Sequence, residues 1–265
     1  MRVSAADDGD QPRRARAVSD LVGFVLVFSL VVSVVAIVSV AGVGTLQDVR
    51  AAEQTNNAER AMEVLADNMG DIAHRGAPSR ATEISLEDAS VRLGDLTYIQ
   101  IRDPDTGSDP AFLEDQVYRT RPIVYDDGNT ELVYVLGAVF REDRRGGTII
   151  EPWSGTFGED RMLLPVTTVR SADDDAQQIQ SSTVLVRAST TTRQVYTAQT
   201  DPGISYDHVW VNVSSSRPDL WDRMLSRKPS VSCTQNGPGW TNCSVGYEPE
   251  QLYVTETQVA VELGQ

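Results

Sequence analysis

The most prominent pattern in the chain is an uncharged run close to its start. No residue from Leu21 to Leu46 carries a charge, and most are valine, leucine, isoleucine or phenylalanine. Roughly 20 such residues are enough to cross a bilayer as a helix. A helix is the only single segment that satisfies its own backbone hydrogen bonds in lipid. The pattern therefore predicts a transmembrane helix over residues 18–46.

Apolar side chains continue beyond this run at a different spacing. From Leu46 to Ile72 they recur mostly at steps of three and four residues, with polar residues between them. This spacing is typical of a helix with one apolar face. Residues 47–76 are therefore predicted to form an amphipathic continuation of the helix, or a stalk. The apolar stripe could pack on the chain's own domain or on neighbouring subunits, and the pattern alone does not distinguish the two.

The remainder, residues 80–265, consists of short apolar or alternating runs separated by turn residues, as in antiparallel β-structure. The sequence predicts an α+β protein: a long N-terminal transmembrane helix, then a mainly antiparallel extracellular β domain, built as a sandwich or rolled sheet. A short helix is expected near Pro218–Ser226. The expected strands are Ser90–Leu93, Leu96–Arg102, Gln116–Tyr125, Leu132–Arg141, Gly147–Ile150, Met162–Val169, Ser182–Ala188, Thr190–Thr200, His208–Ser214 and Leu252–Val261.

The charges beside the apolar run predict how it is oriented. Arg13, Arg14 and Arg16 precede the run, and basic flanks stay in the cytoplasm. Residues 1–17 are therefore predicted to be a cytoplasmic leader, and the β domain is predicted to lie outside the cell. A cleaved secretory signal has a shorter apolar core and a small-residue cleavage site. A twin-arginine signal is also expected to have a short core. The length of this run favours a membrane anchor over both.

The composition limits the partners and suggests a source. The net charge is −15, and a chain this acidic repels phosphate, so nucleic-acid binding is not expected. Of 23 basic residues, Lys228 is the single lysine. Abundant carboxylates with arginine in place of lysine are typical of proteins from extreme halophiles, so a haloarchaeal source is favoured. An ordinary acidic protein from a GC-rich genome would show the same bias.

Two features fit an exported domain. Cys233 and Cys243 flank a segment with Asn-Gly and Pro-Gly turn formers, and a disulfide between them is plausible outside the cell. Asn212-Val213-Ser214 and Asn242-Cys243-Ser244 match the N-glycosylation acceptor pattern. The domain is therefore expected to be a disulfide-bonded glycoprotein, with Asn212 and Asn242 as candidate acceptors.

No pattern in the chain predicts catalysis. The sequence has no phosphate-binding glycine loop, no nucleophile elbow and no His-Glu-x-x-His. His74, near the end of the predicted helix, is expected to cap the last carbonyls as an imidazolium. An acidic loop with Asp103, Asp105, Asp109 and Glu114 only partly matches a calcium loop, and a solvated turn is favoured. No enzyme activity, resident metal or cofactor is expected.

The N-terminal segment resembles a known kind of precursor. Val18, Ser19, Leu21, Val22 and Gly23 fit the pattern that begins the mature chain in archaeal type IV pilin-like precursors, although Asp20 stands where that pattern has proline. The resemblance covers about 30 residues. It implies that a prepilin peptidase cuts between Ala17 and Val18.

These expectations define two hypotheses about function. The first is a pilin-like structural or interaction protein of the cell surface, whose partners are the bilayer and other pilin-like subunits. The second is a membrane-tethered binding or enzymatic domain for which the helix is only an anchor. The first is preferred, and the mature N-terminus distinguishes them.

Overall fold

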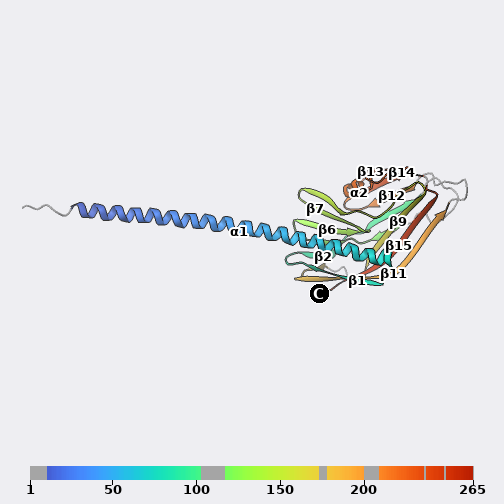
Figure 1. The fold of residues 1–265 in the computed structure, drawn as a ribbon, viewed down its shortest axis with the longest axis horizontal. Helices are drawn as coiled ribbons and strands as arrows, with labels where there is room; N and C mark the ends of the chain where they lie inside the picture. Colours follow the sequence, from blue (N-terminus) through green and yellow to red (C-terminus); the bar gives the residue numbers. More distant parts are fainter. Residues whose placement is uncertain are drawn as a thin grey trace, which may run out of the picture. The chain divides into compact units, whose positions relative to one another are not determined.

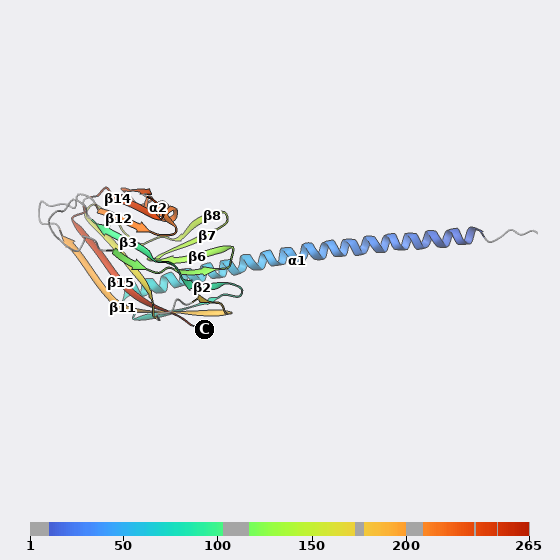
Figure 2. The ribbon, with the colours of Figure 1, turned by 180° about the vertical axis from the view of Figure 1, so that it is seen from behind.

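The computed structural model describes residues 11–102, 117–172, 178–199, 209–235, 237–247 and 249–264. The chain separates into two compact units, Met1–Gln54 and Thr55–Gln265. The described part of the first unit is entirely helical. The second unit contains the end of that helix, a short helix and all of the described strands, as Figures 1 and 2 show.

Helix α1 extends without interruption from Gln11 to Arg75. The described side chains between Leu21 and Val40 are all exposed to solvent, as expected of a helix whose natural surroundings are lipid. Gly76 follows with a φ of 79°, the left-handed conformation that ends many helices.

The part of α1 from Thr55 to Arg75 belongs to the second unit and packs within it. One face of this part of the helix consists of five buried apolar side chains: Ala58, Met62, Leu65, Met69 and Ile72. Polar contacts accompany them. Glu59 pairs with Arg141 at 3.2 Å, and Asn68 Nδ2 donates to Thr82 Oγ1 at 2.9 Å. The stripe therefore packs on the chain's own domain, which was one of the two alternatives that the sequence left open.

The described strands form three sheets. The four-stranded sheet has the order β1 (Ser79–Ser85), β11 (Thr183–Gln199), β15 (Gln251–Gly264), β9 (Arg161–Ser171). The six-stranded sheet has the order β10 (Gln178–Ile179), β2 (Ser90–Leu93), β5 (Ile123–Asp126), β6 (Thr130–Val135), β7 (Ala138–Asp143), β8 (Gly146–Glu151). The five-stranded sheet has the order β13 (Val231–Gln235), β14 (Trp240–Val245), β12 (Val209–Ser214), β3 (Thr97–Arg102), β4 (Val117–Thr120).

Pairing is antiparallel throughout the described strands, except that β15 runs parallel to β9. The four- and five-stranded sheets meet where β4 approaches β9. There Arg121 N–H donates to Val169 O at 3.0 Å, and Val169 N–H donates to Thr120 Oγ1 at 2.9 Å. These two bonds satisfy both backbone groups of Val169 and so join β9 to the end of β4.

Two hydrophobic clusters fill the second unit. One contains the buried face of α1 together with side chains of β1, β11 and β15 and one face of the six-stranded sheet. The other contains the opposite face of the six-stranded sheet, the inner face of the five-stranded sheet and helix α2 (Pro218–Leu225). Alternate residues of a strand point to opposite faces, so a strand such as β6 contributes to both clusters.

These observations confirm the predicted fold class, an α+β protein with one apolar N-terminal helix and a mostly antiparallel β domain. Some details differ. The predicted strand 132–141 is two strands joined by a tight turn at Leu136 and Gly137, both with positive φ. The predicted strands 182–188 and 190–200 are a single strand, β11, which has a β-bulge between Thr190 and Thr192.

Candidate functional site

The apolar segment is the clearest functional feature of the chain. Among the described residues, one helix is long and apolar enough to span a bilayer, over Leu21–Val40. A helix of this kind joined to a β-rich domain is compatible with a membrane-anchored protein. Ala17 and Val18, the predicted processing residues, also lie within α1, in a stretch whose side chains are outside the described part.

The structure contains the predicted disulfide. Cys233 on β13 lies directly opposite Cys243 on β14, and their sulfur atoms are bonded. Cys243 is buried in the cluster behind the five-stranded sheet, whereas Cys233 is only partly buried. The bond therefore holds an edge strand against its neighbour.

The two sequons lie on adjacent strands. Asn212 and Asn242 are direct partners in the pairing of β12 with β14. The side chain of Asn212 is 4% exposed, so a glycosyltransferase has no access to it in the folded domain. Asn242 is half-buried. Modification of either residue stays a prediction, and modification of Asn212 would have to precede folding.

The acidic loop with Asp103, Asp105, Asp109 and Glu114 lies outside the described residues, as does His208. Within the described ranges, no three histidine, cysteine or carboxylate side chains are grouped in a way that could hold a metal ion.

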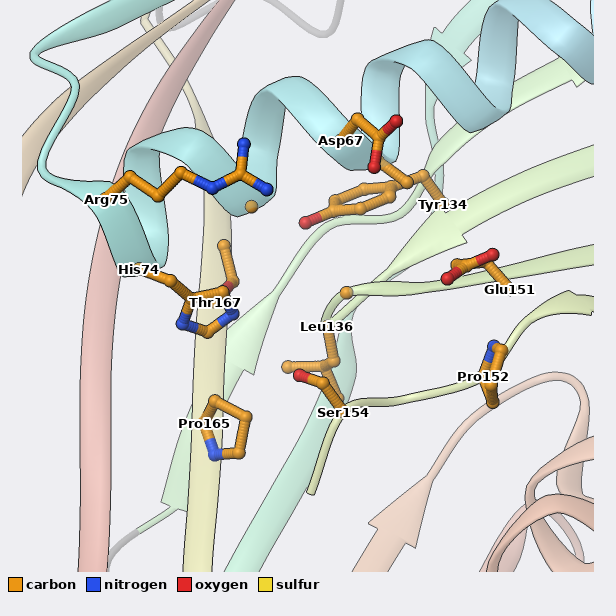
Figure 3. Close-up of a pocket in the computed structure, with 13 residues that line it drawn as sticks. Asp67, His74, Arg75, Tyr134, Leu136, Glu151, Pro152, Ser154, Pro165 and Thr167 are labelled. Carbon is orange, nitrogen blue, oxygen red and sulfur yellow. The ribbon is translucent and has the colours of Figure 1, made fainter. Parts of the chain in front are cut away.

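A cavity of about 200 Å³ lies beside the last turns of α1 in the second unit. Figure 3 shows Asp67, His74 and Arg75 of the helix on one side, with Tyr134, Glu151 and Ser154 among the residues opposite. Pro165 and Thr167 of β9 complete the wall next to His74. The sequence did not predict this site, because its lining comes from segments far apart in the chain.

The electrostatics of this cavity disfavour a charged histidine. Burial lowers the pKa of His74, and the positive charges of Arg75 and Arg193 lower it further. Arg193 also donates through Nη2 to the carbonyl of Ile72 in the last turn of α1. A guanidinium from β11 therefore holds that carbonyl, and its positive charge disfavours an imidazolium at His74. Capping of the other last carbonyls by His74 stays a prediction.

In the part of the chain that the structure describes, no hydrogen bond joins His74 to the hydroxyl of Ser154 or Thr167, so the pairing of a nucleophile with a base is not seen there. Burial raises the pKa of Tyr134 well above its ordinary range, which keeps its phenol neutral. The arrangement can hold a small polar molecule or waters but shows no proton-transfer pair.

Comparison with known proteins adds one finding. A model of a family of unknown function (DUF7289) matches residues 16–262. The chain belongs to this family. No curated protein and no solved structure gives a significant match. The matched range covers the whole of the apolar segment and nearly all of the β domain, so both are parts of the same family unit.

His74 should make the stability of this DUF7289 protein depend on pH. Its pKa in the fold lies below the ordinary value of 6.5, so the unfolded chain takes up the proton first as the pH falls. Stability is therefore complete above pH 6.5 and declines below it, until the folded pKa is reached. We expect His74→Gln to flatten this decline in Tm measured from pH 7.5 to pH 5. An equally steep decline in the variant would contradict the assignment.

Proposed function

We propose that the chain is a pilin-like cell-surface protein, anchored by its N-terminal helix and presenting a β-rich domain to the medium. The observation that carries this proposal is the apolar run Leu21–Val40, helical and exposed along its whole length, which begins within the pilin-like segment Val18-Ser19-Asp20-Leu21-Val22-Gly23. Its family membership adds no activity, because the family has no assigned function.

The proposed orientation places the N-terminus in the cytoplasm. Arg13, Arg14 and Arg16 precede the run, and basic residues are retained inside. The disulfide between Cys233 and Cys243 supports an outside location for the domain, since such bonds persist in oxidising surroundings. The high acidic charge also suits a domain exposed to a saline medium.

The proposed role is structural or interactive rather than catalytic. Because the domain itself buries the stripe of α1 from Ala58 to Ile72, this stripe is not available to other subunits. The exposed run upstream is then the part of the helix left for lipid, or for neighbouring pilin-like subunits after the leader is removed. A prepilin peptidase would make the cut between Ala17 and Val18.

The alternative is a tethered binding or enzymatic domain. The observation in its favour is the cavity lined by Asp67, His74 and Glu151. An intact leader would accompany this alternative, because a plain anchor needs no processing.

Mapping the mature N-terminus tests the proposal. Protein extracted from membranes of the native host is expected to begin at Val18 in mass spectrometry, and to occur as well in the fraction sheared from cells. The matched control is a chain in which Gly23→Ile alters the predicted recognition segment without adding charge, which should leave the leader attached. Wild-type protein that keeps Met1 throughout would contradict the pilin-like reading and favour the plain anchor.

A further inference from the structure

The five-stranded sheet has one face in the core and one face outside it. Ile99, Ile101, Val211 and Val213 point into the buried cluster. The residues between them on the same strands must point the opposite way. Strands β14, β12 and β3 lie side by side in Figure 2. Their outward positions include six residues that we call the aromatic–amide face: Tyr98, Gln100, Trp210, Asn212, Trp240 and Asn242.

Strand register places the aromatic rings around a polar centre. Ser214 of β12 is paired with Trp240 on one side and with Tyr98 on the other. Two rings therefore flank a small residue in a single row, about two strand spacings or roughly 10 Å apart. Trp210 lies two rows further along β12. Trp240 is 36% exposed, an unusual degree for a tryptophan on a sheet.

The row between these aromatic residues consists of amides. Asn212 is paired with Asn242 on β14 and with Gln100 on β3. Among these three side chains of the described strands, the one hydrogen bond is long, from Asn212 Nδ2 to Gln100 Oε1 at 3.5 Å. Amide side chains each offer two donors and an acceptor, so this row has hydrogen-bonding capacity that its own members do not use.

Two buried polar atoms of this face lack partners. Asn212 Oδ1 and Trp210 Nε1 are each inaccessible and form no hydrogen bond with the described residues. The large majority of buried side-chain polar atoms in folded proteins are paired, so each of these two atoms needs an explanation. Because neither atom is accessible, a ligand on this face meets the partly exposed amides of Gln100 and Asn242 instead, which both donate and accept.

The charge of the face differs from that of the rest of the chain. No Asp or Glu occupies the outward positions of the described strands of this sheet, although the chain has a net charge of −15. Arg102 and Arg119, both exposed, are the charged residues there. In a chain with this many carboxylates, most of the surface is expected to carry them. A face that has none and is bordered by two guanidinium groups therefore fits an anionic rather than a cationic ligand.

We propose that the aromatic–amide face binds a saccharide chain that carries acidic groups, such as a uronic acid polymer. Rings of Trp240 and Tyr98 would pack on the apolar C–H faces of the sugars, and the partly exposed amides of Gln100 and Asn242 would pair with hydroxyls. Arg102 and Arg119 would hold carboxylate groups. The inference rests on the proposed function only in placing the face outside the cell, where such a polymer is encountered.

Binding to a defined probe tests this assignment. The full chain is produced in a bacterial host without N-glycosylation, placed in lipid nanodiscs, and titrated calorimetrically with oligogalacturonate. The neutral probe is an oligogalactoside of equal length. We expect saturable binding of the acidic probe, and an affinity about tenfold lower in Trp240→Ala, the size expected for loss of one aromatic contact. The preference for the acidic probe should shrink in ~1 M salt, where charges are screened within about 3 Å.

The control variant is Tyr253→Ala. Tyr253 lies on β15 of the four-stranded sheet, and the Arg161 guanidinium is 5.9 Å from its ring centre. It is therefore also an aromatic residue beside an arginine, but it is not part of the aromatic–amide face. Its removal should leave the affinity unchanged. A double variant Arg102→Gln, Arg119→Gln should bind the acidic and neutral probes equally.

Several outcomes would overturn the assignment. The first is that the acidic probe shows no saturable binding to the wild-type chain. The second is that Trp240→Ala and Tyr253→Ala lose affinity for it equally. The third is that the wild-type chain binds the acidic and the neutral probe with equal affinity. A sugar chain on Asn242 in native protein would also overturn it, because that chain would occupy the same face. None of these results depends on the N-terminus, so a chain that begins at Val18 but does not bind contradicts only the saccharide assignment.

Discussion

Trp153→Ala is expected to lower the free energy of unfolding by about 3–5 kcal/mol, the usual cost of truncating a large buried aromatic side chain. Trp153 is 0% exposed. Its indole Nε1 donates to the carbonyl of Pro165 at 2.7 Å, and its ring meets Phe157 edge to face at 6.2 Å between centroids. The alanine variant loses this packing and leaves the carbonyl of Pro165 without its donor.

Two comparisons separate these contributions. Trp153→Phe keeps much of the ring volume but removes the indole donor. We therefore expect its free energy of unfolding to lie between those of Trp153→Ala and the wild-type chain. Trp240→Ala removes the same side chain from a partly exposed position and should cost about 1 kcal/mol or less. Urea unfolding of the full chain in detergent, followed by circular dichroism, measures all three. Similar losses for Trp153→Ala and Trp240→Ala would show that the described core is wrong around Trp153.

Leu65→Ala is expected to cost about 3 kcal/mol, whereas Val64→Ala should change stability by no more than about 0.5 kcal/mol. The two residues are neighbours on α1, but Leu65 is 1% exposed and Val64 is 51% exposed. Leu65 belongs to the cluster that includes Ile84 and Val186. Its truncation leaves a cavity between the helix and the sheets, while Val64 has little packing to lose.

This pair also tests how α1 is used. If the stripe from Ala58 to Ile72 served mainly to contact other subunits, Leu65→Ala would leave the unfolding of a dispersed monomer unchanged. Equal, small effects for Leu65 and Val64 would therefore contradict the docking of the helix on its own domain. The measurement is the same urea unfolding, made at several protein concentrations to exclude a contribution from association.

The burial of the stripe divides α1 into two functional parts. Residues from Thr55 onward are structural components of the domain. The exposed run from Leu21 to Val40 has no such role, which is why the proposed anchoring and processing depend on it. Mutations in the two parts should accordingly have different effects, on domain stability in one case and on membrane attachment in the other.

Several features of the β domain followed directly from local sequence. The helix Pro218–Leu225 was expected because proline near its start and a buried face of Leu220, Trp221 and Met224 are local signals. Strand β2 was expected with its observed bounds. By contrast, β13 and β14 were not predicted, because their serine, threonine and asparagine residues hide the apolar alternation on which such predictions depend.

The sequence by itself therefore determined the apolar segment, the end of the first helix, the α+β class and the positions of many strands, because each depends on neighbouring residues and their period. The start of that helix was placed too late, at residue 18, whereas α1 begins at Gln11. Only the tertiary structure decided which surface covers the helix stripe, which charges lower the pKa of His74, and which residues meet across the five-stranded sheet. Those outcomes depend on strand order and register. Side chains more than a hundred positions apart, such as Gln100 and Asn212, become neighbours only when distant strands pair.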